Sequence, residues 1–590
     1  MKKAIIAGSF DPITFGHIDI MKRAANVFDQ LVVGIGVNPD KKYTFSLEER
    51  KEMVHQSLSA FPEVSSKVKI VYFQGLLVDY AYENRIPVIV KGVRDEKDLD
   101  YELTLFQVGE SQKPGVDTFL LPARQGMTHI SSSSVKALQK EQGLVHEYVP
   151  LYVKQCLEAR LSGQYIIGIT GGICTGKSYI GKKFEELGNM RGIPVHNIEL
   201  DYIPHRMYDG TLKEPIYVNL RRKIVDTFGK EVELPDGSIN RRALGEIVFG
   251  NSQKLEKLNE LVYEPLMIAL RREMYAKKGL ILLNAALIAE AEMIHLSNNN
   301  VVLVSADKQS QERRLKERNL AKEQIERRLA SQYTKKEKSK KIEAAISEHK
   351  QGKLWTIDNS DGADPSKIAV LFDEIIKYID QYGELRFRGL WERIGADGTP
   401  DAEYQRLLEA YSQSHRVYHS LPHIVRGLDE HAEAKHLMEH PDQVLFAWWY
   451  HDFVMQRKSR VDEERSAQIA YNVCKNALLP DDFAENVKTL ILATKHHDMP
   501  TTIDGKYIVD IDLAIFGRSV AEFDNYEESI RVEYQWTNPE EFRSGRIAVL
   551  ERFLNRPTIY YTDFFRNKYD TQARRNLEQS LKKLRKDITS

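Results

Sequence analysis

Residues 6–20 read IAGSFDPITFGHIDI, in which an apolar run ends at a glycine and a helix opens soon afterwards on Gly16-His17. Glycine lets the backbone approach an anion, and the first turn of a helix offers unpaired N–H groups and a favourable dipole. The stretch therefore predicts a strand–loop–helix unit that binds phosphate groups, with Ser9 and His17 as donors. A structural turn without a ligand is the alternative interpretation.

Five short apolar runs follow one another in residues 1–160, separated by helical periods: AIIAG, LVVGIGV, VKIVYF, VIVKGV and TFLLPA. This alternation predicts a parallel sheet in a Rossmann-like α/β domain. Lys41 follows the second run, Lys91 and Arg94 lie at the end of the buried fourth run, and Lys136 follows a run of serines. Cations that converge at the carboxyl ends of parallel strands form an anion-binding crevice.

Residues 1–160 resemble bacterial phosphopantetheine adenylyltransferase through GSFDPITFGHIDI, DKKYTFSLEER, GLLVDYA, VKGVRDEKDLDYE and ISSSSVK. The resemblance implies that 4'-phosphopantetheine attacks the α-phosphorus of ATP, assisted by Mg²⁺, and that His17 is catalytic. The implied phosphopantetheine-binding residues are Ser9, Lys41, Leu77 and Lys91. The implied ATP-binding residues are Ser9, Phe10, His17, Gly92, Arg94, Glu102, Ser131, Ser132 and Ser133.

Two observations bear on this resemblance. The family usually has arginine where Lys91 stands, and lysine keeps the charge but loses the bidentate fork. A nucleotidylyltransferase that acts on nicotinamide mononucleotide is the rival enzyme, and the stretch GLLVDYA disfavours it.

Residues 171–178, GGICTGKS, match the phosphate-binding loop pattern and lie between the strand-like YIIGIT and the helical YIGKKFEEL. In such a loop the backbone N–H groups surround phosphates, Lys177 reaches the β- and γ-phosphates, and Ser178 binds Mg²⁺. The sequence therefore predicts an ATP site made of Gly171, Gly172, Ile173, Cys174, Thr175, Gly176, Lys177 and Ser178. The later apolar runs LILLN and NVVLVSA predict further strands, so this part is expected to be a second α/β domain.

Residues 165–382 resemble dephospho-CoA kinase through GITGGICTGKS, ELDYIPHR, NAALIAE, QERRLKERN and TIDNSDG. The resemblance implies that Asp201 is the catalytic base, that Arg314 and Asn359 contact ATP, and that Arg318 and Arg328 belong to a lid. Asn284 and Ala286 replace the family's aspartate and proline near the acceptor. A nucleotide-sensing module with little or no kinase activity is therefore the alternative. The charged stretch from residue 311 predicts exposed helices.

Helical patterns dominate after about residue 382 and predict an all-α domain over residues 385–590. Within it, Pro422 predicts the first turn of a helix that contains His423, and His451-Asp452 follows the apolar FAWWY. Asp512 is expected at the start of another apolar helix. Placing such groups among apolar residues carries a desolvation cost unless they bind something, and the alternative is ordinary core packing.

This last part resembles the HD superfamily of metal-dependent phosphohydrolases through YHSLPHI, AWWYHD, DEERSAQIA, ILATKHHD, DIDLAIFG and IRVEY. The implied metal ligands are His423, His451, Asp452 and Asp512. Glu464 is the implied catalytic group that orients water, and His496 and His497 are expected to bind substrate phosphate or a second metal. Imidazole and carboxylate ligands suit Mn²⁺, Fe²⁺, Zn²⁺, Ni²⁺ or Co²⁺. A regulatory binding module is the alternative.

Composition indicates a cytoplasmic protein of several domains that acts on small molecules. Acidic and basic residues nearly cancel, at 85 and 84, which argues against a bulk electrostatic role on nucleic acid or membrane. Cys156, Cys174 and Cys474 lie far apart, so no disulfide framework is predicted. The apolar runs are too short to span a bilayer. The expected partners are ATP, 4'-phosphopantetheine and dephospho-CoA, and the adenylyltransferase resemblance implies a homo-oligomer.

Overall fold

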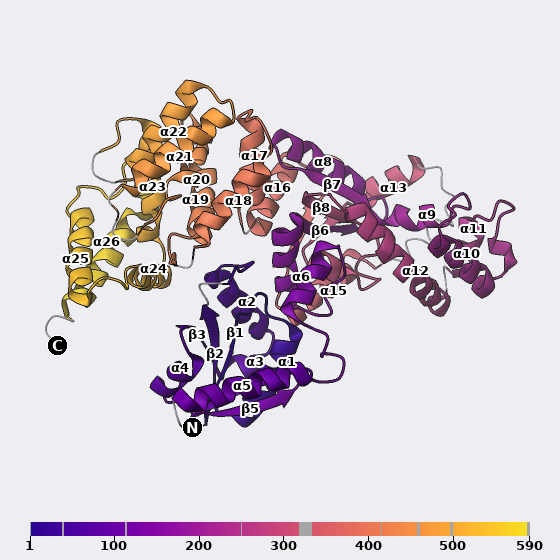
Figure 1. Cartoon of the computed structure of the whole chain (residues 1–590). Coiled ribbons are helices and arrows are strands. Elements are labelled where there is room, and N and C mark those ends of the chain that lie inside the picture. Colours follow the sequence, from indigo (N-terminus) through magenta and orange to yellow (C-terminus); the bar gives the residue numbers. More distant parts are fainter. Residues whose placement is uncertain are drawn as a thin grey trace. The chain divides into compact units, whose positions relative to one another are not determined.

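The computed structural model describes residues 2–37, 41–112, 115–248, 251–317, 333–380, 382–413, 415–456, 459, 461–495 and 499–586. The chain divides into two compact units, one of residues 1–190 and 194–375 and one of residues 191–193 and 376–590. The first unit contains two five-stranded sheets, and the second is helical wherever it is described (Figure 1).

The first sheet has the strand order β3-β2-β1-β4-β5 and is parallel throughout, as the sequence predicts. Its strands are β1 (Lys3–Gly8), β2 (Gln30–Val37), β3 (Val68–Gln74), β4 (Val88–Val93) and β5 (Asp117–Pro122). The helices of this part are α1 (Phe15–Val27), α2 (Leu47–Ser59), α3 (Pro62–Ser65), α4 (Leu77–Glu83), α5 (Glu96–Gln112), α6 (Ser132–Lys140), α7 (Leu151–Leu157) and the π-helical turn η1 (Glu158–Ser162).

The central strand β1 sets the geometry of the first site. The strand order reverses between β1 and β4, and ligands of open parallel sheets bind at such a reversal, beyond the carboxyl ends of the strands. Helix α1 packs closely on β4 because Gly92 has no side chain: an added Cβ would lie 3.0 Å from Cγ1 of Ile20. The start of α1 is thereby held next to the end of β1.

The second sheet is also parallel, with the order β10-β9-β6-β8-β7. Strands β6 (Gln164–Gly171), β8 (Gly279–Asn284) and β9 (Val301–Ser305) were predicted, whereas β7 (Val195–Glu199) and β10 (Leu354–Asp358) were not. The helices here are α8 (Lys177–Met190), η2 (Leu200–Tyr202), α9 (Ile203–Met207), α10 (Pro215–Phe228), η3 (Lys230–Val232), α11 (Arg241–Val248), α12 (Ser252–Met274), η4 (Ile294–Ser297), α13 (Lys308–Glu317), α15 (Lys335–His349) and α16 (Ser366–Ile379).

The charged stretch after residue 311 is less uniformly exposed than its composition predicts. Helix α15 is mostly exposed, but Lys338 is 0 % exposed and Ile342 is also buried. Ile342 packs with residues of β9 and of the segment before it, so an apolar position every turn draws this helix onto the sheet. Arg318 and Arg328 lie outside the described residues.

A buried polar cluster connects the helix after the first sheet with a turn of the second. Lys154 Nζ lies 2.6 Å from Glu158 and donates to Oδ1 of Asn298 at 2.9 Å. Nδ2 of Asn298 donates to Glu158 at 2.6 Å, and all three side chains are buried. Buried charges are tolerated where each finds an opposite charge and hydrogen bonds, as here.

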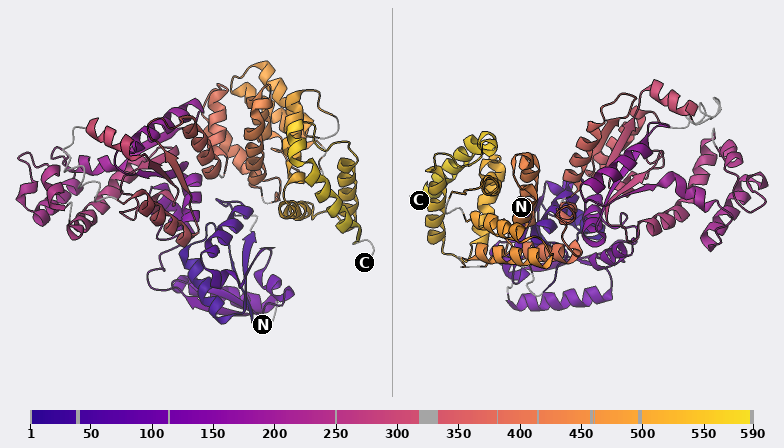
Figure 2. Two further views of the ribbon diagram at one scale, coloured as in Figure 1. Left: turned by 180° about the vertical axis from the view of Figure 1, so that it is seen from behind. Right: turned by 90° about the horizontal axis from the view of Figure 1, so that it is seen from above.

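The second unit has no strand among its described residues, in agreement with the predicted all-α domain (Figure 2, orange to yellow). Its core includes Trp448, Trp449 and Tyr450, which are 0 % exposed. Its helices are α17 (Glu384–Arg393), α18 (Pro400–Tyr411), α19 (Leu421–Ala434), η5 (Lys435–Leu437), α20 (Pro441–Tyr450), α21 (Asp462–Asn476), α22 (Asp481–Ala493), α23 (Ile503–Leu513), η6 (Ala514–Gly517), α24 (Val520–Glu533), α25 (Pro539–Leu554) and α26 (Asp563–Lys586). Among the described helices, none has the length and apolar character that crossing a bilayer requires.

Candidate functional site

The start of α1 orients the imidazole of His17. Thr14 caps the helix, and its backbone N–H donates to Nδ1 of His17 at 3.0 Å. Because Nδ1 accepts this bond, the proton of the neutral ring lies on Nε2. Burial and the neighbouring Arg94 lower the pKa of His17 to about 4, so the ring is neutral at pH 7. His17 therefore presents a neutral N–H donor.

A second group of contacts holds the loop after β2 against the end of β1. Lys41 Nζ donates to Oγ of Ser9 at 3.5 Å, which brings together two of the predicted phosphopantetheine-binding residues. The buried Asp11 accepts bonds from the backbone N–H groups of Thr44 and Phe45 and from Lys136 Nζ at 2.8 Å. The sequence analysis did not single out Asp11, although Asp11 lies in the quoted motif. A carboxylate is negatively charged and is therefore not an obvious candidate for a phosphate site.

Arg50 reinforces this arrangement. Its guanidinium is buried and donates to the carbonyl of Ser9 at 2.7 Å and to that of Gly36. The backbone around Ser9 is therefore fixed before any ligand binds. Arg50 was also missed, because an arginine on a helix with the sequence LEERKEM reads as a solvent-exposed charge.

Most of the other residues predicted to bind ATP or phosphopantetheine lie near the end of β4 and the start of α6. Lys91 pairs with Glu102 at 2.9 Å, and Arg94 pairs with Asp98 at 2.8 Å. Ser131 caps α6, and Ser132 Oγ donates to the carbonyl of Pro12 at 2.8 Å, which joins the start of α6 to the loop after β1. Leu77 is the first residue of α4, Gly92 lies in β4, Phe10 is buried, and Ser133 lies in the exposed first turn of α6.

The second sheet positions the phosphate-binding loop between β6 and α8. Gly171 ends β6, and Gly176 has φ +90°, a conformation that favours glycine. Lys177 begins α8, and its Nζ donates to the carbonyls of Gly171 and Gly172 at 3.3 and 3.2 Å. Burial lowers the pKa of Lys177, while nearby Asp201 opposes that shift. Ile173, Cys174 and Thr175 form the loop, and Ser178 is exposed in the first turn of α8.

Two further predicted ATP-binding residues pack on this loop. Nδ2 of Asn359 donates to the carbonyl of Thr175 at 2.9 Å. Arg314 donates to the carbonyl of Cys174 at 3.3 Å and to that of Asn359 at 2.7 Å. An added Cβ at Gly176 would lie 2.0 Å from Nδ2 of Asn359, so the glycine makes this close packing possible.

The expected acceptor side lies at the ends of β7 and β8. Asp201 Oδ2 accepts a bond from the backbone N–H of Ala286 at 3.0 Å. Nδ2 of Asn284 donates to Glu199 at 3.1 Å, and its buried Oδ1 has no partner among the described residues. The buried Lys338 pairs with Glu290 and donates to the carbonyl of Ala286 at 2.6 Å. Lys338 was missed because it stands in a run of lysines that reads as solvated.

In the second unit, four polar side chains converge from helices α19, α20 and α23. Nε2 of His423 and Nε2 of His451 lie 3.2 Å apart. Asp452 Oδ2 lies 3.1 Å from Nε2 of His451, and Asp512 Oδ1 lies 3.6 Å from Nε2 of His423. All four predicted metal ligands are therefore close together. One ligand atom each from His423, His451 and Asp512 lies within 4.8 Å of the other two.

The orientation of these groups suits a cation. His451 directs Nδ1–H at the carbonyl of Trp448, 2.8 Å away, so its Nε2 faces the other predicted ligands. Burial alone would lower the pKa of His451, but Asp452 raises it. Burial and His451 lower the pKa of His423 to about 3, so His423 is neutral. Burial alone would raise the pKa of Asp452, but His451 and His419 hold it well below its ordinary value. Two imidazoles and two carboxylates form a donor set that fits Mn²⁺, Fe²⁺, Zn²⁺, Ni²⁺ or Co²⁺.

The other predicted residues of this site have different outcomes. Asp512 is the second-last residue of α23, and not at a helix start, because the apolar run IVDIDL begins within that helix. Glu464, on α21, forms an ion pair with Lys495. The proposed roles of His496 and His497 fall outside the described residues.

Two residues that the sequence analysis did not single out hold the loop before α19. Glu533 is buried and accepts bonds from the backbone N–H groups of residues 417–419 and from Nδ1 of His419 at 2.7 Å. Burial alone would lower the pKa of His419, but Glu533 and Asp452 raise it to about 9. Arg416 donates to the carbonyls of His419, Asp452 and Phe453. The only signal for Glu533 was its place in the quoted stretch IRVEY.

Comparison with known proteins defines the class of both transferase parts. Residues 5–138 match the cytidylyltransferase-like family, and residues 165–352 match the dephospho-CoA kinase family. The chain thus combines a nucleotidyltransferase fold with a dephospho-CoA kinase domain. Through its N-terminal region it belongs to the phosphopantetheine adenylyltransferase family.

Two curated relatives document this membership. Phosphopantetheine adenylyltransferase of Clostridium kluyveri is 42% identical over 150 residues, which are 25% of this chain and 89% of that protein. The enzyme of Caldanaerobacter subterraneus subsp. tengcongensis is 40% identical over 157 residues, which are 27% of this chain and 96% of that protein. A crystal structure of a Thermus thermophilus protein is 24% identical and covers 37% of this chain and 96% of its own, with a TM-score of 0.27.

Proposed function

We propose that the chain carries out two consecutive ATP-dependent steps of coenzyme A biosynthesis. In the first, a phosphate oxygen of 4'-phosphopantetheine attacks the α-phosphorus of ATP, the bond to the β-phosphate breaks, and pyrophosphate and dephospho-CoA are formed. The observation that carries this step is the neutral His17, whose Nε2–H is held as a donor at the start of α1. Such a donor stabilises the negative charge of the transition state, and positioning supplies the rest of the catalysis.

In the second step, the ribose 3'-hydroxyl of dephospho-CoA attacks the γ-phosphorus of a second ATP, which yields CoA and ADP. Asp201 accepts the hydroxyl proton, and Lys177 contacts the transferred phosphoryl group, as in other phosphate-binding loops. The bonds from Lys177 Nζ to the carbonyls of Gly171 and Gly172 support this role, because they keep the ammonium group beside its own loop.

A coupled assay of the full-length protein tests this proposal. Given ATP, Mg²⁺ and 4'-phosphopantetheine, the wild type should form dephospho-CoA and then CoA. Lys177→Ala should stop CoA formation and let dephospho-CoA accumulate, with pyrophosphate release unchanged. His17→Asn should instead reduce pyrophosphate release. Dephospho-CoA accumulation in the wild type would favour the alternative, in which the kinase-like part only senses a nucleotide.

For the second unit, we propose a metal-dependent phosphohydrolase centred on His423, His451, Asp452 and Asp512. When bound, a divalent ion would supply the positive charge that acidifies a water molecule and polarises a phosphoryl group. The chain itself orients the ligands: Trp448 fixes the tautomer of His451, and Arg416 holds the backbone of Asp452. His419, held protonated by Glu533, adds a positive charge beside Asp452.

Removal of one ligand tests the metal site and the activity separately. Asp512→Asn should weaken Mn²⁺ binding, measured by the electron paramagnetic resonance signal of unbound Mn²⁺, and should abolish phosphate release from phosphorylated pathway intermediates. Lys495→Gln, at the partner of Glu464, should leave Mn²⁺ binding unchanged. Strong Mn²⁺ binding with no phosphate release from any such intermediate would favour a metal-stabilised binding module instead.

A further inference from the structure

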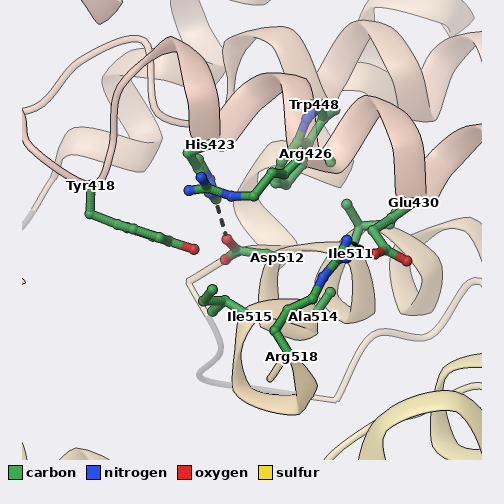
Figure 3. A pocket seen from close by; sticks show the side chains of 11 residues that line it. Tyr418, His423, Arg426, Glu430, Trp448, Ile511, Asp512, Ala514, Ile515 and Arg518 are labelled. Carbon is green, nitrogen blue, oxygen red and sulfur yellow. Dashed lines mark hydrogen bonds and ion pairs between the residues drawn. The ribbon is translucent and has the colours of Figure 1, made fainter. Parts of the chain in front are cut away.

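A cavity of about 270 Å³ lies beside the predicted metal ligands of the second unit. His423 and Asp512 form one part of its wall, and Tyr418, Arg426 and Trp448 adjoin them (Figure 3). The remaining wall is formed by Gly427, Glu430, Ile511, Ala514, Ile515 and Arg518. The lining of the cavity therefore includes two of the four predicted metal ligands.

Arg426 supplies a positive charge to this cavity. It lies three residues after His423 on α19, so both side chains project from the same face of the helix. In Figure 3 its guanidinium extends towards His423 and the hydroxyl of Tyr418. The guanidinium carbon lies 5.4 Å from the centre of the Tyr418 ring. Within the described part of the chain, Arg426 forms no ion pair.

The second arginine of the cavity is engaged elsewhere. Arg518 pairs with Glu430, which also accepts bonds from Lys568 at 2.8 Å and from the hydroxyl of Tyr569 at 2.6 Å. Figure 3 shows Arg518 and Glu430 side by side at the far end of the cavity from His423. The charge of Glu430 is therefore compensated by residues of the fold, which leaves Arg426 to meet a ligand.

The chemistry of the wall favours a small oxyanion. With a divalent cation on the metal ligands, the cation, Arg426 and the Tyr418 hydroxyl would all face the same space, and Ile511, Ala514 and Ile515 form an apolar part of the wall. Hydrogen bonds from a charged donor to an anion are stronger than bonds between neutral groups. The un-ionised hydroxyl of Tyr418 can donate a hydrogen bond to such an anion.

We propose that Arg426 and the hydroxyl of Tyr418 bind the phosphoryl oxygens of a phosphate monoester at the metal centre. The inference rests on the phosphohydrolase function proposed above and names the part of the substrate that this cavity holds. The remainder of a larger substrate would extend out of the cavity.

The test uses the full-length protein without nucleotide, loaded with one equivalent of Mn²⁺ and titrated with inorganic phosphate. Bound Mn²⁺ accelerates the phosphorus-31 relaxation only of phosphate that binds close to it, so phosphate in the two ATP sites adds little. Arg426→Gln removes the proposed charged contact. Arg426→Lys keeps the positive charge but cannot form the two parallel hydrogen bonds of a guanidinium. Lys435→Gln, an exposed position just after α19, controls for net charge. Asp512→Asn provides the baseline without the metal site.

The wild type and Lys435→Gln should show the same saturable relaxation enhancement. Arg426→Gln should weaken phosphate binding by roughly tenfold or more, with Arg426→Lys intermediate, because charge-assisted bonds are among the strong ones. Mn²⁺ affinity should be the same in the wild type, Arg426→Gln, Arg426→Lys and Lys435→Gln. Equal phosphate affinity in Arg426→Gln and wild type would overturn the inference and leave the metal site standing. Failure of the wild type to bind Mn²⁺ would instead overturn the phosphohydrolase proposal together with this inference.

If Arg426→Gln lost Mn²⁺ binding through misfolding, Arg426→Lys would decide. Weakened phosphate binding in Arg426→Lys with intact Mn²⁺ affinity would support the inference, and unchanged phosphate binding would contradict it.

Discussion

In two histidines of this protein, a single hydrogen bond to the backbone determines which ring nitrogen points towards the candidate site. The N–H of Thr14 fixes the tautomer of His17, and the carbonyl of Trp448 fixes that of His451. The first ring thus presents its Nε2–H as a donor, whereas the second turns Nε2 towards the other predicted metal ligands. In the functions proposed above, the same residue type would therefore bind an anion in one part of the chain and a metal ion in another.

Replacement of His17 tests this assignment at the residue scale. His17→Asn should lower kcat for pyrophosphate release about 10²- to 10³-fold, since loss of one donor to a developing oxyanion has about this effect. The KM for ATP should change much less. Thr14→Ser, which keeps the capping hydroxyl, serves as the control and should retain activity. An unchanged kcat in His17→Asn would contradict the role of His17.

The lowered pKa of His17 also has a measurable consequence. Since it lies near 4 and not at the ordinary 6.5, the imidazole should not titrate between pH 8 and pH 5.5. Its nuclear magnetic resonance signal, identified by its absence in His17→Asn, should keep its chemical shift over that range. A midpoint near pH 6.5 would mean that the ring is charged just below neutral pH.

At the scale of elements, close helix packing depends on small residues at a few positions. In α19, an added Cβ at Gly427 would lie 2.0 Å from the indole of Trp448. That indole donates to the carbonyl of Ile424 at 2.8 Å and stacks on His451 with ring centres 4.2 Å apart. The contact between α19 and α20 thus also positions a predicted metal ligand.

Gly427→Ala should therefore destabilise the second unit by about 1–3 kcal/mol through overpacking against a rigid ring. Hydrogen exchange in α19 and α20 should become faster, and Mn²⁺ affinity should fall because His451 moves with Trp448. Gly545→Ala, in the middle of α25 with open space around it, is the matched control. It should be neutral or stabilise by about 0.5–1 kcal/mol. Equal effects of the two substitutions would contradict the packing argument.

The strands show which elements could be predicted from sequence patterns alone. All five strands of the first sheet and three of the second were predicted, because each contains a run of apolar residues, and in β6 and β8 every residue is buried. Strands β7 and β10 were missed because VHNIE and LWTID are only five residues long and form neither a continuous apolar run nor a regular alternation of polar and apolar residues. Short edge strands of this kind form only by pairing with a neighbouring strand, here β8 and β9, and the sequence of the edge strand alone does not show that pairing.

At the scale of the whole molecule, the two sheets of the first unit are linked through the buried cluster of Lys154, Glu158 and Asn298. Both charges are almost fully desolvated, so each depends on the other. Removal of one partner of a buried ion pair leaves an uncompensated charge and is strongly destabilising.

Lys154→Met should therefore cost about 3–5 kcal/mol at this junction. Limited proteolysis should cleave the chain near residues 158–163 faster than in the wild type. Lys140→Met removes an exposed lysine at the end of α6 and should leave the cleavage rate unchanged. Equal protection of wild type and Lys154→Met would show that the cluster does not hold the two parts together.

The sequence alone determined the alternation of elements, the phosphate-binding loop and the types of residue at the three sites, because periodicity and motif spacing are local properties. Only the tertiary structure decided which groups are buried and which partners they meet. Lys338 is buried although it stands in a run of lysines, Asp512 lies at the end and not the start of its helix, and Arg426 faces the cavity of the metal ligands. The physical reason is that burial and charge compensation depend on segments far apart in the chain, as when Glu533 on α24 holds His419 in place.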